Sequence, residues 1–164
     1  MNGQNGKALY FPRKKRRQVL TLGVRGATTV LDNDAEEMLR ATRELLYTIV
    51  RVNEIREEDV ASVYFTTTRD LDAVFPATAA RQLGWLNAAL ICGNEMPVQG
   101  SIQKCIRILL HWNTRKPLAD IHHVYLHEAK RLRPDRSNIP VIPEEEMAAV
   151  LELAEAGLLK RWVS

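Results

Sequence analysis

The sequence predicts an α+β protein in which helices cover one face of a mixed β-sheet. Segments of strand length alternate with helical segments in the order β-α-β-α-β-β-β, without an internal repeat. The chain has 164 residues and an apolar fraction of 46%, enough for one domain with a sizeable core. Proline and glycine separate the segments at positions that favour turns.

The first half of the chain is predicted to contain two strands and two helices. They comprise the strands 18–30 and 60–67 and the helices 34–53 and 76–84. The first strand is rich in valine and leucine and is expected to end in a turn around Gly26. The first helix has Asp34 among its candidate caps and repeats apolar residues at a helical period. Pro76 and Gly84 are typical of the start and the end of a short helix.

The second half is predicted to contain three more strands and a tail helix. The strands comprise 88–92, 102–112 and 122–132, the last one ended by Pro134. After Pro143, three glutamates and the later Lys160 and Arg161 suit the two ends of a helix dipole. The tail helix has an apolar stripe, formed by Met147, Val150, Leu151, Ala154 and Leu158. This stripe must pack against the chain's own core, a neighbouring subunit or another partner, and we favour contact within an oligomer of the chain.

We expect the chain to have three parts. Residues 1–17 form a flexible basic extension, residues 18–135 form the folded domain, and residues 136–164 form the tail. The formal net charge is +3, but residues 1–17 carry six cations and no acid, so the remainder carries −3. The Arg13–Arg17 run could touch nucleic acid or a membrane surface. A solvated tail is favoured, because runs of charge at chain termini are usually solvated.

Four arginines and one glutamate are the candidate site residues. Arg107 interrupts an otherwise apolar strand, so it either points into a polar cavity or lies on an exposed face, and patterning leaves both open. Arg25, Arg81 and Arg133 are each unremarkable alone, but together they could bind carboxylates through bidentate hydrogen bonds. Glu95 follows a strand, where functional carboxylates are often found, although taken alone it is more typical of a solvated loop residue.

No pattern in the sequence indicates a metal, a cofactor or a nucleophile. His122, His123 and His127 lack the convergent third and fourth ligands that zinc requires, and we therefore expect no metal site. Cys92 and Cys105 are far apart and suggest free thiols in a reducing, cytoplasmic compartment. No apolar run is long enough to span a membrane. The sequence therefore favours a reaction that the protein promotes by positioning the substrate and by placing charges around it.

Six segments in order resemble one known family. They are Val24–Val30, Asp72–Ala77, Cys92–Met96, Cys105–Arg107, His123–Leu126 and Leu132–Asp135. The family is the monofunctional chorismate mutases with a trimeric, pseudo-barrel α+β fold. The resemblance runs from about Val19 to Asp135, so the basic extension and the tail inherit nothing from it.

The resemblance implies a homotrimer that rearranges chorismate to prephenate, without a cofactor, in clefts between subunits. Phe75 and Arg81 would come from one subunit. The facing subunit would supply the remaining residues, which are Arg25, Cys92, Glu95, Arg107, Tyr125, Leu132 and Arg133. Arg107, Glu95 and Arg25 would be catalytic, and the others would bind substrate. The alternative is a trimeric metabolite-binding or imine-processing protein, which would not need Glu95 and Arg107 together.

Overall fold

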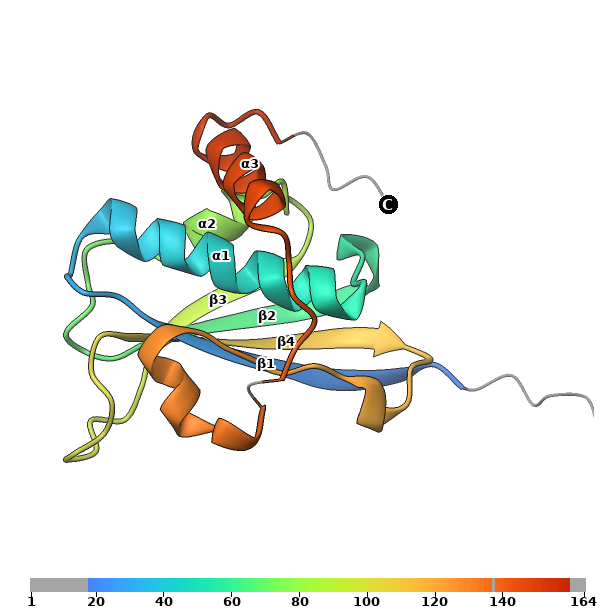
Figure 1. Ribbon diagram of the computed structural model, residues 1–164, viewed down its shortest axis with the longest axis horizontal. Helices are drawn as coiled ribbons and strands as arrows, with labels where there is room; N and C mark the ends of the chain where they lie inside the picture. Colours follow the sequence, from blue (N-terminus) through green and yellow to red (C-terminus); the bar gives the residue numbers. More distant parts are fainter. Residues whose placement is uncertain (1–17, 137, 160–164) are drawn as a thin grey trace, which may run out of the picture.

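The computed structural model describes residues 18–136 and 138–159 and has a five-stranded mixed sheet (Figure 1). Its strands are β1 (Leu20–Thr29), β2 (Val60–Thr67), β3 (Ala89–Asn94), β4 (Cys105–Thr114) and β5 (Val124–Tyr125). They are arranged in the order β3-β2-β4-β1-β5. The central β4 pairs antiparallel with β1 and β2, whereas the outer strands β3 and β5 pair parallel with their neighbours. The expected α+β class is confirmed.

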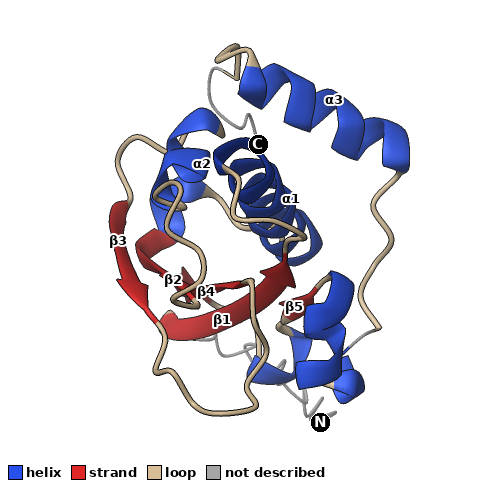
Figure 2. Cartoon of the chain, turned by 90° about the vertical axis from the view of Figure 1, so that its left-hand side faces the viewer, coloured by secondary structure: helices blue, strands red, loops and turns tan. Residues whose placement is uncertain are grey.

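Three helices lie on one side of this sheet (Figure 2). They are α1 (Ala35–Asn53), α2 (Ala77–Gln82) and α3 (Glu144–Glu155). α1 lies against the sheet and buries Leu45, Leu46 and Ile49 in a core that includes Phe65 and Leu110 of the strands. Burial of these side chains is the main driving force for joining the two layers.

The opposite face of the sheet is largely open. Among the described residues no α-helix covers it, and only the 3₁₀ turns of His127–Leu132 lie over one end. Tyr64 and Ile91, on neighbouring strands, remain 47% and 55% exposed. A sheet with one covered and one open face needs polar residues or a further partner on the open side.

β1 does not end in the turn expected around Gly26. The strand continues from Leu20 to Thr29, and all ten residues pair with β4. Gly26 is needed for close packing instead: a Cβ there would lie 2.7 Å from Ile49 Cδ1 of α1 and 3.0 Å from the carbonyl oxygen of Val124. The glycine marks the point where α1 and β5 approach the strand most closely.

The last predicted strand, 122–132, is wrong over most of its length. Only Val124 and Tyr125 pair as a strand, and His127, with φ of 48°, turns the chain into a 3₁₀ helix that runs to Leu132. A short apolar run cannot distinguish the two conformations by its period. The turn buries Ala129 against Ala27 and Cys105, a contact that a continued strand would lose.

The tail helix α3 packs on α1 of its own chain, and contact of its stripe with another copy stays a prediction. Leu151 and Ala154 are buried, and Glu146 accepts hydrogen bonds from Tyr47 and from Arg51. Leu158 does not belong to the stripe, because the helix ends at Glu155 and the chain turns away. The basic extension and the pair Lys160 and Arg161 lie outside the described residues. No helix within those residues has the length and apolar character needed to cross a membrane.

We predict that Gly26→Ala destabilises the protein and that Gly23→Ala on the same strand does not. The added methyl at position 26 overlaps Ile49 and a backbone oxygen, which should lower the free energy of unfolding by about 1–3 kcal/mol. At position 23 the nearest atom lies at 3.4 Å, an ordinary contact. Urea denaturation followed by circular dichroism measures both, and equal stabilities would contradict this account of Gly26.

Candidate active site

One row of residues crosses all five strands on the open side of the sheet. In strand order it consists of Gly93, Thr66, Arg107, Ala27 and Tyr125, each paired in register with the next. Directly paired residues on adjacent strands point to the same face. The row therefore brings together residues that are almost 100 positions apart in the chain.

A cleft of about 500 Å³ lies over this row, and we call it the arginine cleft. It is lined by Arg25, Gly26, Ala27, Tyr64, Thr66, Glu95, Arg107, Ile108, Leu109, Tyr125, Leu132 and Arg133. Six of the nine predicted site residues are among them. Tyr64 and Thr66 were not predicted, although their alternation with buried residues in a β-branched strand places them on one face.

Arg107 and Glu95 form an ion pair at the centre of the cleft. Arg107 Nη1 lies 2.6 Å from Glu95 Oε2, and the two side chains are only 31% and 26% exposed. The hydroxyl of Thr66 donates a hydrogen bond to the other carboxylate oxygen of Glu95. Arg107 thus points into a polar cavity, and Glu95 is not a solvated loop residue. The pair fixes the direction of the guanidinium before any ligand arrives.

Arg25 adds a second guanidinium to the arginine cleft. No described residue forms an ion pair with its side chain, so its donors remain available to an anion. Its backbone N–H donates to Nδ1 of His123 at 3.1 Å. Burial, and then the positive charge of Arg25, lower the pKa of His123, which favours the neutral ring.

Arg133 lies at the edge of the arginine cleft and is bound by a carboxylate. Its Nε and Nη2 donate to the two oxygens of Asp135 at 2.9 and 2.7 Å. The hydrogen bonds from Arg133 hold the pKa of Asp135 at about 2, so this carboxylate stays ionised and offsets part of the arginine's charge. Arg133 consequently contributes less positive potential than Arg25.

Tyr125 and Leu132 form the apolar end of the cleft. Tyr125 is mostly buried and packs with Ala27, Cys105 and Leu132 beneath the 3₁₀ turn. Burial raises the pKa of the Cys105 thiol to about 11, so it remains protonated at neutral pH. This cysteine therefore contributes packing rather than a thiolate nucleophile.

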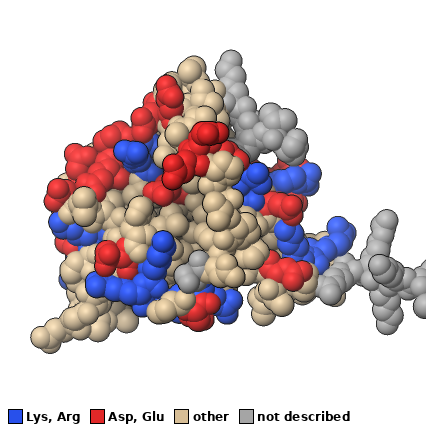
Figure 3. All heavy atoms as spheres, viewed as in Figure 1, with Lys and Arg blue, Asp and Glu red and all other residues tan. Residues whose placement is uncertain are grey.

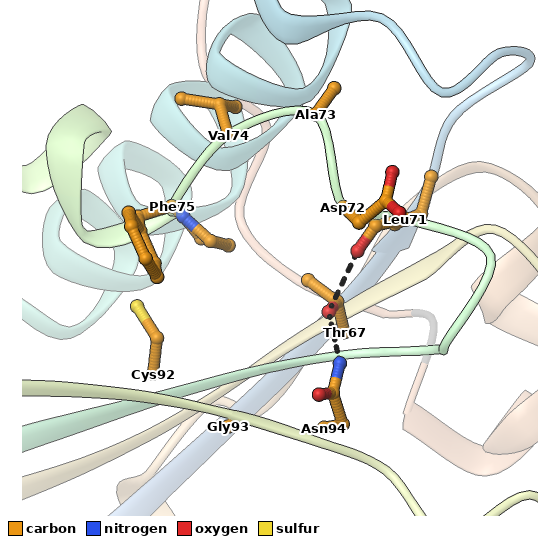
Figure 4. Close-up of a pocket in the computed structure, with 10 residues that line it drawn as sticks. Thr67, Leu71, Asp72, Ala73, Val74, Phe75, Cys92, Gly93 and Asn94 are labelled. Carbon is orange, nitrogen blue, oxygen red and sulfur yellow. Dashed lines mark hydrogen bonds between the residues drawn. The ribbon is translucent and has the colours of Figure 1, made fainter.

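Phe75 and Cys92 lie in a different pocket of about 430 Å³ (Figure 4). Phe75 precedes α2 and is 73% exposed, and the Cys92 sulfur on β3 is turned toward its ring. Cys92 thus groups with Phe75 within the chain, whereas it was expected on the side of Glu95. Arg81 lies exposed on α2 and lines neither pocket.

The arginine cleft is suited to an anion with an apolar body. Arg107, held by Glu95, and the unpaired Arg25 supply guanidinium groups, and Tyr125 and Leu132 supply apolar surface. Within residues 18–136 and 138–159, no cluster of three potential metal ligands is present. The arrangement can orient a small anion and stabilise negative charge that develops on it.

Comparisons with known proteins identify the family of the chain. The family model "Chorismate mutase type I" matches residues 21–136. The chain is 48% identical to chorismate mutase AroH of Thermus thermophilus over 69% of its length and 93% of that protein. It is 45% identical to chorismate mutase AroH of Bacillus subtilis, over 70% of its length and 91% of that protein. A solved chorismate mutase from Clostridium thermocellum has a TM-score of 0.66 and 51% identity, covering 67% of this chain and 98% of that one. The chain therefore belongs to the type I chorismate mutases, which convert chorismate to prephenate.

Proposed function

We propose that the chain performs this rearrangement as a homotrimer, in which the arginine cleft of one subunit faces Phe75 and Arg81 of another. The observation that carries the proposal is the Arg107–Glu95 ion pair, held at 2.6 Å beside the unpaired guanidinium of Arg25. A cytoplasmic location agrees with the two free cysteines, Cys92 and Cys105.

The reaction needs positioning and charge rather than a nucleophile. Chorismate carries two carboxylates, a ring hydroxyl and an ether oxygen, and its rearrangement breaks a C–O bond while a C–C bond forms. No proton is transferred and no covalent enzyme intermediate is required. A protein accelerates such a step by binding the folded conformer of the substrate and by stabilising the charge that separates in the transition state.

Arg107 has the central role in this mechanism. Its guanidinium faces the ether oxygen, where negative charge grows as the C–O bond breaks, and it also reaches a substrate carboxylate. Glu95 holds Arg107 in this orientation and accepts a hydrogen bond from the ring hydroxyl. Because Arg107 acts on charge that is present mainly in the transition state, it raises the rate more than the affinity.

The remaining residues bind the ends of the substrate. Arg25 and Tyr125 hold the side-chain carboxylate, and Leu132 packs against the apolar part. From the facing subunit, Phe75 covers the ring and Cys92 contacts the ring hydroxyl. Arg133 of the arginine cleft and Arg81 of the facing subunit bind the ring carboxylate and close the mouth of the cleft.

The open face of the sheet supports the homotrimer. Tyr64 and Ile91 are exposed there, beside the arginine cleft, and would be buried between subunits. Within one chain, Phe75 and Cys92 line a pocket that shares no residue with the arginine cleft. The arginine cleft and the pocket of Phe75 and Cys92 each lack groups that the reaction needs. Contact between the arginine cleft of one subunit and the Phe75 pocket of another would supply them.

The alternative of a metabolite-binding or imine-processing protein is less well supported. A binder needs cations for affinity but gains nothing from a carboxylate held against Arg107, since Glu95 would repel an anionic ligand. The loss of chorismate absorbance in the ultraviolet, followed with purified protein, separates the two functions. Unchanged chorismate would refute the enzymatic proposal.

We predict that Arg107→Lys lowers kcat by at least about 10²–10³-fold, the typical cost of a lost preorganised donor. A lysine keeps the charge but cannot serve two acceptors at fixed angles. The matched control is Arg115→Lys, because Arg115 is exposed beyond the end of the same strand and far from the arginine cleft. Near-full turnover of Arg107→Lys in the absorbance assay would show that the role given to Arg107 is wrong.

We predict a sedimentation mass of about 56 kDa, three times the 18.7 kDa of one chain. Mixing subunits tests the shared cleft directly. Arg107→Ala should be nearly inactive and Arg81→Ala should bind chorismate weakly, and the two proteins should recover activity at low substrate concentration when they are denatured and refolded together. Random assortment restores roughly one cleft in four, because each cleft needs one intact face from each of two subunits. No recovery from a confirmed mixed trimer would mean that each cleft is built from one chain.

We predict that the stability of the protein falls as the pH drops below about 6.5, the ordinary histidine value. The pKa of His123 is lowered in the folded state, chiefly by burial. The unfolded chain therefore binds the proton more readily, and the contribution present above pH 6.5 is lost toward acid. His123→Gln should flatten the dependence of the melting temperature on pH between about 5 and 7. An identical slope in both proteins would argue against this role for His123.

A further inference from the structure

Arg43, in the middle of α1, is a fully buried arginine at the junction of the three helices. Its side chain has an exposed fraction of 0%. Nη1 donates to Gln82 of α2, and Nη2 donates to Glu36 of α1 and to Glu155 of α3, all at 2.7 Å. A single guanidinium thus joins three helices through fixed, directional bonds. A buried charge is tolerated only when it is paired and hydrogen-bonded in this way.

The bond to Gln82 matters because α2 is short. The helix has only six residues, from Ala77 to Gln82, which is too few to be stable without tertiary contacts. Its N-terminal part is anchored by buried alanines, and its last residue is held by Arg43. Arg81 immediately precedes Gln82, and Phe75 lies just before the helix. The orientation of both proposed site residues therefore depends on how α2 is held.

The bond to Glu155 connects this junction to the tail. α3 lies outside residues 21–136, the part of the chain that matches the family. Figures 1 and 2 show α3 stacked on the outer side of α1, close to α2. Glu155 is the last residue of α3, and at the other end of the helix Glu146 lies 2.6 Å from Arg51. Both ends of α3 are tied to α1 by ion pairs.

Carboxylates also gather around this region at the surface. In Figure 3 acidic side chains cluster over the start of α1 and over α3. They include Glu36 and Glu37 in the first turn of α1 and Glu144, Glu145 and Glu146 in the first turn of α3. Of the exposed acids, Glu36 and Glu155 bend inward to reach Arg43. Without Glu155, the guanidinium would keep one carboxylate and lose its link to the tail.

We infer that Arg43 is a positioning residue, through which the C-terminal helix α3 fixes α2 and thereby tunes substrate affinity. The chain of contacts runs from Glu155 through Arg43 to Gln82, and from there to Arg81 in the facing half of the cleft. The inference rests on the proposed function of Arg81 and Phe75 as substrate-binding residues. It assigns the tail a role in the active site although none of its described residues lines the arginine cleft.

Two substitutions test the two links separately. Glu155→Gln removes the charge that ties α3 to Arg43, and Gln82→Met removes only the acceptor on α2. Each should raise KM by about threefold to tenfold, less than the ~10²-fold cost of a 1 Å misplacement. kcat should stay within about twofold, because a lost uniform binding contact raises KM alone. The matched control is Glu152→Gln, an exposed glutamate of α3 that no ion pair engages among the described residues.

Coupling to Arg81 distinguishes positioning from a purely structural effect. If the links act through Arg81, then Glu155→Gln should no longer change KM in an Arg81→Ala background. Additive effects on KM, or a fall in kcat with KM unchanged, would overturn the inference. Should Glu155→Gln fail to fold, Gln82→Met decides alone, since it leaves Arg43 paired with both carboxylates. Should Arg81→Ala itself leave KM unchanged, then the proposed substrate-binding role of Arg81 is wrong, and not only the link from Glu155 through Arg43 to Gln82.

Discussion

The charge of Arg107 in the central strand determines how the site is built. β4 pairs with two neighbours and is apolar on the side that faces α1, so its one arginine must find partners on the open side. Glu95, which follows β3, provides the partner, and the hydroxyl of Thr66 on β2 holds this carboxylate by a hydrogen bond. A guanidinium held by a carboxylate keeps a fixed direction at little entropic cost on binding. The same constraint makes this region of the sheet a poor core and a good anion site.

The two faces of the sheet have different roles: one carries the apolar core, and the other carries the candidate active site. The helix side buries the large apolar side chains, and there Gly26 allows α1 to approach the strand. The open side carries the row from Gly93 to Tyr125, with exposed Tyr64 and Ile91 beside it. Activity that uses this side can vary without disturbing the core. The exposed apolar side chains are of the kind that interfaces bury, which suits the proposed homotrimer.

The helical layer is connected by charges as well as by apolar packing. Arg43 is enclosed by three helices, and its hydrogen bonds reach α2 and α3. A buried ion pair is weak evidence for stability, because desolvation offsets much of the attraction. Its directional bonds are better explained by orientation: a six-residue helix with a proposed substrate residue needs one defined position.

The sequence by itself determined the type of most elements and the candidate charges. α1, β2 and α3 follow clear local periods, and an arginine inside an apolar run is visible without coordinates. Local pattern could not identify the partners: the pairing of Arg107 with Glu95, the row that joins Ala27 to Tyr125, and the grouping of Cys92 with Phe75 depend on strand order and register. The early end of β5 and the meaning of Gly26 likewise follow from contacts with α1 and the 3₁₀ turn. Propensity acts over a few residues, whereas a site of this kind is assembled from segments almost 100 residues apart, so tertiary packing decides it.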